Sequence, residues 1–135
     1  MYKFPITIEF EDIDSYGIIH HPKVLYYFER ARVHFFIDNG VDLNKLKYGV
    51  VLRNLNIQYK IPLLFMDNVC VEVSAKNIEK FRFELDYKIV KESKNAVVST
   101  IELCVIDLET KKLSPIPDEI RVLLEKISVC NVTTG

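Results

Sequence analysis

The second half of the chain carries the periodicity of β-strands. Apolar residues recur at every second position, as half-buried strands require, and predict strands at residues 51–61, 69–76, 81–89 and 96–107. Runs rich in Asn, Asp, Glu and Lys separate the last three, and such residues favour tight turns. Near the start, Ile6, Ile8 and Phe10 alternate with polar residues and predict a strand that ends before residue 12.

A different period appears between residues 22 and 39, where apolar side chains recur at helical spacing. Pro22 suits the first turn of a helix, and Asn39 with Gly40 suits its end. A shorter amphipathic helix is predicted at residues 118–126. One strand, one long helix and four strands joined by tight turns predict an α+β fold, an antiparallel sheet with a helix on one face.

Composition narrows the class of protein. A chain of 135 residues forms one domain, and 49% hydrophobic with 27% charged residues is typical of soluble proteins. The net charge of −1 gives no reason to expect nucleic acid or an anionic membrane as partner. The longest apolar runs, such as 61–66, are too short for a transmembrane segment, and no signal-peptide core precedes the first strand. We therefore predict a cytoplasmic protein.

No metal site is predicted. The three cysteines are odd in number and widely spaced, which favours neither a disulfide framework nor a zinc site; they are Cys70, Cys104 and Cys130. Residues 12–17 imitate the start of a calcium-binding loop, but Tyr16 replaces an oxygen ligand and Lys23 stands where the bidentate Glu belongs.

Two carboxylates, Asp12 and Asp14, lie in the loop that leads into the long helix. Asp commonly caps backbone N–H groups in such turns, and for Asp12 we predict this role. Asp14 stands closer to a helix start, where backbone N–H groups favour developing negative charge.

The same stretch carries a longer pattern, made of Asp12, Asp14, Gly17, Ile18, Ile19, His21, Tyr27, Phe28, Glu29, Ala31 and Arg32. This pattern resembles the signature of the hotdog-fold acyl-CoA thioesterases. The closest branch is the 4-hydroxybenzoyl-CoA thioesterase-like group, which includes the thioesterases encoded beside the Tol-Pal system. Segments 57–67 and 117–121 also resemble family segments, so the likeness runs from residue 4 to about 126.

The resemblance implies a hotdog domain, with five antiparallel strands wrapped around one long central helix. We place this domain at residues 1–128 and expect a flexible tail at 129–135. It also implies assembly across subunits, as a homodimer or homotetramer. The reaction implied is hydrolysis of an acyl-CoA thioester, with coenzyme A as part of the substrate and no cofactor.

Residue roles follow from the matched motif. Asp14 is predicted to be the nucleophile or the general base, and both roles stay open. His21 is predicted to orient water or the carbonyl oxygen, Gly17 to shape the turn, and N–H groups at the helix start to polarise the carbonyl. The predicted substrate-binding residues are Ile19, Tyr27, Glu29, Lys80 and Arg82.

Simpler roles exist for three of these residues. Glu29 and Arg32 are three apart on the helix and form an ordinary ion pair in the simplest interpretation. Lys80 and Arg82 are predicted to hold coenzyme A phosphates, but solvated charges at a strand end are the alternative.

The same fold has alternative functions. They are a thioesterase acting on an acyl carrier protein, a hotdog hydratase and a non-catalytic acyl-thioester-binding protein. The hydratase is disfavoured because its His-Phe-Pro-rich motif is absent. A serine-hydrolase mechanism has no support because no Gly-x-Ser-x-Gly motif occurs.

Overall fold

The computed structural model describes residues 1–128 and contains a sheet, two α-helices and two short 3₁₀ turns. In chain order the elements are β1 Tyr2–Thr7, η1 Phe10–Asp12, α1 Lys23–Asp38, η2 Leu43–Lys45, β2 Tyr48–Tyr59, β3 Asn68–Lys76, β4 Arg82–Lys91, β5 Lys94–Asp107 and α2 Asp118–Lys126. The predicted tail, 129–135, lies outside the described residues. None of the helices in residues 1–128 has the length and apolar character needed to cross a membrane.

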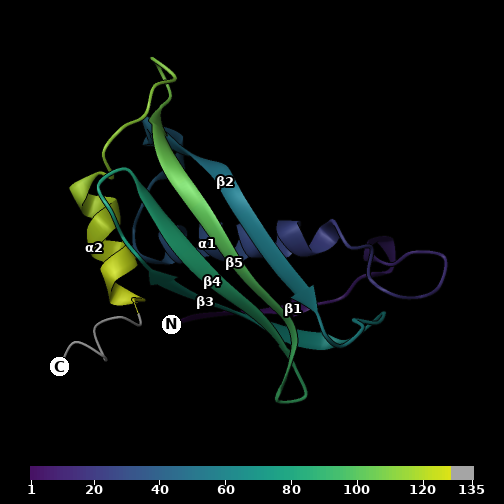
Figure 1. Cartoon of the computed structure of the whole chain (residues 1–135). Coiled ribbons are helices and arrows are strands. Elements are labelled where there is room, and N and C mark those ends of the chain that lie inside the picture. Colours follow the sequence, from purple (N-terminus) through teal and green to yellow (C-terminus); the bar gives the residue numbers. More distant parts are fainter. Residues whose placement is uncertain (129–135) are drawn as a thin grey trace.

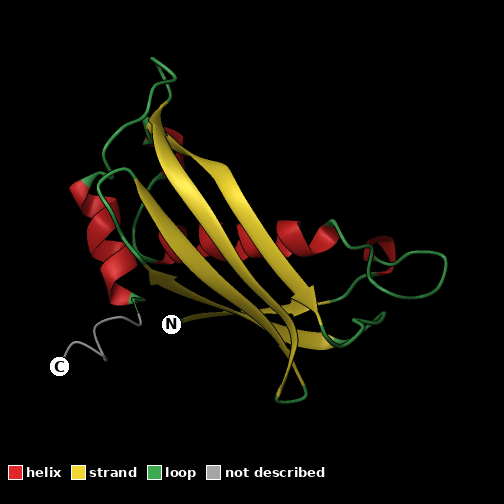
Figure 2. Ribbon diagram, viewed as in Figure 1, coloured by secondary structure: helices red, strands yellow, loops and turns green. Residues whose placement is uncertain are grey.

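All strand pairs are antiparallel, in the order β1-β3-β4-β5-β2. Helix α1 runs across one face of this sheet, while α2 lies beside the end where β4 begins (Figure 1). Figure 2 shows the same layering, with the long helix behind the strands. This is the predicted α+β architecture, and it confirms the hotdog arrangement of five antiparallel strands around one long helix.

Burial follows the predicted alternation where the sheet faces α1. In β3, and in β4 as far as Ile89, every second side chain is at most 5% exposed; these are Val69, Val71, Val73, Ala75, Phe83, Leu85, Tyr87 and Ile89. Helix α1 covers them with Val24, Phe28 and Ala31, and the Phe28 ring stacks on Tyr87 with centroids 4.4 Å apart. Burial of this face contributes roughly 25 cal/mol per Å² of apolar area and fixes the height of α1 above the strands.

The first predicted strand is wrong at its end. β1 stops at Thr7, which pairs with Asn68, the first residue of β3. Beyond that point β1 has no partner strand, so the chain leaves the sheet and forms the η1 turn. Ile8 stays buried, but Phe10 is 73% exposed instead of continuing the apolar face.

Strand β2 forms one edge of the sheet and differs from the inner strands. It begins at Tyr48, earlier than predicted, because Tyr48 to Val50 continue the pairing with β5. A bulge at Arg53 interrupts the register. Four apolar side chains remain substantially exposed, Val51 at 41%, Leu52 at 49%, Leu55 at 37% and Tyr59 at 44%.

Candidate active site

The loop between η1 and α1 projects beyond the sheet, at the end where β4 finishes (Figure 1). Backbone hydrogen bonds hold it against the segment that precedes β3: Ile19 N–H donates to Leu63 O at 2.8 Å, and Met66 N–H donates to Ile8 O at 2.9 Å. Most donors and acceptors in the loop are therefore satisfied by protein, which fixes its shape without regular secondary structure.

The segment before β3 is itself anchored to the sheet. Lys91, the last residue of β4, places Nζ 2.6 Å from Asp67 Oδ2 and donates to Pro62 O at 3.2 Å. The same Asp67 oxygen accepts the Leu64 N–H at 2.7 Å. The loop is thus supported by a second loop, which a side-chain ion pair ties to the strand.

Asp14 organises the turn with one of its carboxylate oxygens. Oδ1 accepts the N–H groups of Tyr16 at 2.8 Å and Ile18 at 3.3 Å, and Gly17 N–H donates to Asp14 O at 3.1 Å. Gly17 has φ +80°, a conformation that favours glycine. Within residues 1–128 no group bonds to Oδ2, and Asp14 is exposed. One oxygen holds the turn while the other stays open for chemistry.

Asp12 is used differently, as predicted. It is only 7% exposed, and its Oδ2 accepts the Glu9 N–H at 3.2 Å and the Tyr27 hydroxyl at 2.6 Å. Lys23 Nζ lies 3.7 Å from its other oxygen. Burial, with the hydrogen bond to Asp12, raises the pKa of Tyr27. Asp12 therefore joins η1 to α1, and both of its oxygens lie against groups of the protein.

The start of α1 leaves one backbone donor available. The N–H groups of Lys23, Val24 and Leu25 each donate to the carbonyl three residues earlier, and Pro22 has no N–H. The predicted donors of the first helical turn are thus already occupied. In the described part of the chain, the N–H of His21 has no acceptor. The His21 N–H is therefore the backbone group at this helix start that can polarise a substrate carbonyl.

Tyr59, the last residue of β2, fixes the position of His21. Its ring stacks on the His21 imidazole with centroids 4.6 Å apart, and its hydroxyl donates to His21 O at 3.2 Å. Partial burial raises the pKa of Tyr59, so its hydroxyl stays protonated as a donor near neutral pH. Tyr59 belongs to segment 57–67, which resembles a family segment, but the sequence does not predict its contact with His21, 38 residues away.

An apolar groove begins beside His21 and runs along α1. It has a volume of about 370 Å³ and lies between the exposed side of α1 and the adjacent strands β2 and β5. Its walls include Pro22, Leu25 and Arg32 on the helix side, with Leu52 and Leu103 on the sheet side. A cavity of about 170 Å³ continues from it past Arg32. Such a groove can take an apolar acyl group whose carbonyl lies at the start of α1.

The model of the thioesterase-like superfamily matches residues 8–124. This chain belongs to that superfamily. An acyl-CoA thioesterase YbgC of Haemophilus influenzae is 22% identical over 89% of this chain and 91% of its own length. A 1,4-dihydroxy-2-naphthoyl-CoA hydrolase of Synechococcus elongatus is 25% identical over 92% of this chain and 95% of its own. The crystal structure of an Aquifex aeolicus protein has a TM-score of 0.86 and 28% identity, covering 92% of this chain and 99% of that one.

These similarities confirm the predicted family and the enzyme class, a thioester hydrolase of the superfamily. The roles of individual residues rest on the geometry of the site. Within residues 1–128, His, Cys, Asp and Glu side chains form no group of three that could hold a metal ion.

Two predicted substrate-binding residues of the superfamily motif lie in the core. Ile19 is 2% exposed and Tyr27 is 1% exposed, so neither presents a side chain to a ligand in this chain. Ile19 packs beneath the loop, and Tyr27 donates to Asp12. The structure gives both residues a supporting position instead. Glu29 does line the groove, and its carboxylate lies 3.9 Å from Arg32 as a weak ion pair.

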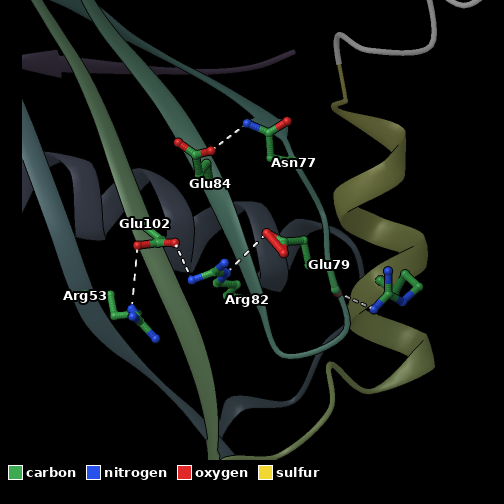
Figure 3. A network of polar contacts seen from close by, with 7 residues as sticks. Arg53, Asn77, Glu79, Arg82, Glu84 and Glu102 are labelled. Atoms are coloured by element: carbon green, nitrogen blue, oxygen red, sulfur yellow. Dashed lines mark hydrogen bonds and ion pairs between the residues drawn. The ribbon is translucent and has the colours of Figure 1, made fainter.

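Lys80 and Arg82 lie at the opposite end of the sheet from Asp14. Arg82 contacts Glu79 at 3.1 Å and Glu102 at 3.4 Å on the face away from α1 (Figure 3), and these carboxylates raise its pKa. Lys80 lies over the Phe81 ring at 5.4 Å. The ten residues of β4 separate the two ends by about 30 Å. Within one protomer the predicted phosphate-binding pair is therefore remote from Asp14.

Proposed function

We propose that this protein is an acyl-CoA thioesterase whose reacting carbonyl lies between Asp14 and the His21 N–H, at the mouth of the groove. The observation that supports this most is the open Oδ2 of Asp14, held in the same short loop as the unpaired donor of His21. A carboxylate and a polarising N–H are what thioester hydrolysis needs, since the thiolate leaves readily.

The reaction forms a C–O bond and breaks a C–S bond. In the general-base route Asp14 takes a proton from water, whose oxygen attacks the carbonyl carbon, and the proton later reaches the departing thiolate. In the nucleophilic route Oδ2 attacks first, and water hydrolyses the resulting anhydride. The His21 N–H stabilises the oxyanion in both, and Gly17 keeps the turn that aims Asp14. The Asp14 side chain supplies the base or nucleophile, so the proposal invokes no cofactor.

A homodimer through β2 is part of the proposal. An unpaired edge strand of twelve residues invites pairing with another strand, and its exposed Leu52, Leu55 and Tyr59 give a second copy apolar surface to cover. A two-fold axis between two β2 strands pairs them antiparallel and places each strand start beside the partner's strand end.

This pairing brings the two remote ends together. The starts of β2 and β4 lie at one end of the sheet, and their ends lie at the other. In the dimer, the end of one protomer that carries Lys80 and Arg82 is on the same side as the loop of the other that carries Asp14. We propose that Lys80 and Arg82 serve the substrate's phosphates across the dimer. The homotetramer and the cytoplasmic location remain predictions from the sequence.

Release of free thiol from a panel of acyl thioesters tests the function. We expect hydrolysis of acyl-CoAs with saturable kinetics. The same acyl groups carried on an acyl carrier protein are the comparison: turnover there, with none on coenzyme A, would favour the carrier-protein thioesterase. Saturable binding of acyl-CoAs without any thiol release would favour the non-catalytic alternative.

A further inference from the structure

Two buried hydroxyl groups under α1 have no hydrogen-bond partner. Within residues 1–128 they are the only buried side-chain oxygen or nitrogen atoms in this condition, Tyr87 Oη and Ser99 Oγ. Tyr87 is 0% exposed and Ser99 is 2% exposed. A buried polar group without a partner costs free energy, so native proteins rarely keep one without a function or a ligand.

The two hydroxyls belong to one row of the sheet. Tyr87 of β4 and Ser99 of β5 are direct cross-strand partners, so their side chains leave the sheet on the same face, a few ångströms apart. Ile57 of β2 extends the same row opposite Ser99. A single buried hydroxyl is common in proteins. Two adjacent hydroxyls, Tyr87 Oη and Ser99 Oγ, instead form a polar spot on a face of the sheet that is otherwise apolar.

Arg32 connects this spot to the groove. Its side chain is 17% exposed and lines both the groove beside His21 and the cavity that continues from it. Arg32 is near enough to the Tyr87 hydroxyl for its charge to act on that group. Burial raises the pKa of Tyr87 to about 12, although the Arg32 charge acts to lower it. The ion pair of Arg32 with the exposed Glu29 is long, at 3.9 Å, and a guanidinium has five donors, so Arg32 can bind a further acceptor.

We propose that Arg32 and the Tyr87 hydroxyl select acyl groups that carry an oxygen substituent, a hydroxyl or a carboxylate, far from the thioester. The inference rests on the proposed function, because it takes the carbonyl to lie at His21. Ser99 completes the polar spot beside them. An apolar acyl end would leave the guanidinium and both hydroxyls desolvated and unpaired, whereas an oxygen substituent accepts their hydrogen bonds.

The spacing along α1 sets the length of the acyl group. Arg32 lies nine residues beyond Lys23, the first residue of α1, about 14 Å along the helix axis, and long helical side chains reach back toward the helix start. The substituent therefore lies several bonds from the carbonyl. An acetyl group is too short to reach Arg32, while a chain of about eight carbons spans the groove.

Three CoA thioesters of equal chain length test the selection: octanoyl-CoA, 8-hydroxyoctanoyl-CoA and suberoyl-CoA. We expect kcat/KM for at least one oxygenated substrate to exceed that for octanoyl-CoA by about tenfold or more. Comparison of the hydroxyl and carboxylate substrates identifies which oxygen group is preferred. In Arg32→Met the ratio of oxygenated to plain substrate falls toward one. Arg30→Met is the matched control, since Arg30 is exposed and faces the Tyr27 ring instead of the groove, and it keeps the wild-type ratio.

Tyr87→Phe separates recognition from folding. The variant keeps the ring that stacks on Phe28 and removes an unpaired hydroxyl, so Tm stays unchanged or rises. The oxygenated-to-plain ratio nevertheless falls. A water bound to these hydroxyls, with no contact to substrate, would leave the ratio unchanged.

The possible failures are distinct. Equal kcat/KM for all three thioesters in the wild type overturns this inference and leaves the thioesterase function standing. A wild-type preference that survives both Arg32→Met and Tyr87→Phe also overturns it, because the oxygen is then recognised elsewhere. If Arg32→Met does not fold, Tyr87→Phe alone decides. Hydrolysis of none of the three removes the proposed function, and this inference with it.

Discussion

At the end of the sheet where β4 finishes, backbone hydrogen bonds join two irregular loops and position Asp14 and His21. At the end where β4 begins, side-chain ion pairs dominate: Arg82 contacts Glu79 and Glu102, and Arg121 donates to Glu79 O at 2.6 Å (Figure 3). Backbone bonds fix atoms closely, as chemistry requires, whereas exposed ion pairs are weak and can be exchanged for a charged ligand. In the proposed function, the first end carries the reaction and the second binds the phosphates of the substrate held by a second copy.

Removal of the reacting group has the largest expected effect. Asp14→Asn keeps an oxygen that can accept the Tyr16 and Ile18 N–H groups, so the turn and Tm are retained. It removes the base or nucleophile, and kcat should fall on the order of 10²–10⁴-fold. Steady-state thiol release measures this. Asp12→Asn is the contrasting variant: it should lower stability through its buried bond to Tyr27 more than it lowers kcat. Full activity in Asp14→Asn would remove Asp14 from the mechanism.

Separation of the two copies is expected to have the next largest effect. Leu55→Lys places a charge on the apolar side of the β2 edge, where Leu55 is 37% exposed, and should shift the protein from dimer to monomer. Activity should then fall about tenfold or more, since each site loses its partner. Light scattering with kinetics at the same protein concentration measures both. Val122→Lys on α2, at a residue 55% exposed away from β2, is the control. A wild type of about 16 kDa in solution would contradict the dimer.

Substitutions at the end of the sheet that carries Lys80 and Arg82 are expected to have the smallest effect. Lys80→Ala combined with Arg82→Ala should raise KM about tenfold and change kcat little, because phosphate contacts far from the carbonyl bind substrate and transition state alike. Lys88→Ala, an exposed lysine on the same strand, controls for lost charge. If KM in the double variant equals that of the wild type, the two residues do not bind the substrate's phosphates and are only strand-end charges. The end of the sheet that carries them then has no role in substrate binding.

Periodicity predicted most of the fold because it reports burial directly. Helix α2 occupies the predicted residues 118–126, and β3 to β5 lie within a few residues of their predicted ranges. Phe10 shows the limit: alternation continued in the sequence, but pairing stopped where β3 begins, opposite Thr7. The pairing of Thr7 with Asn68 joins residues 61 positions apart, and the local hydrophobic pattern does not predict where such pairing ends.

The site divides in the same way. Turn chemistry is local and both carboxylates share it, so the family motif, not the turn, singled out Asp14. The cap that Asp12 provides to Glu9 is local, whereas its buried bond to Tyr27 joins residues 15 positions apart. The stacking of Tyr59 on His21 joins residues 38 apart, and the nearness of Arg32 to Tyr87 joins a helix to a strand that are distant in sequence. Motifs name residues that act, but the packing of distant segments decides which of them are exposed.

The ion pair between Lys91 and Asp67 makes the loop that carries Asp14 sensitive to acid. Burial acts to raise the pKa of Asp67, but the Lys91 ammonium and the Leu64 N–H outweigh it and hold the pKa below its ordinary value. A lowered pKa contributes stability that is fully present above the ordinary pKa of about 4 and is lost as pH falls through the lowered value. Protonation there loosens the segment that supports the Asp14 loop, while the apolar core has no such dependence. Acidification should therefore inactivate the enzyme by local loosening before the sheet itself unfolds.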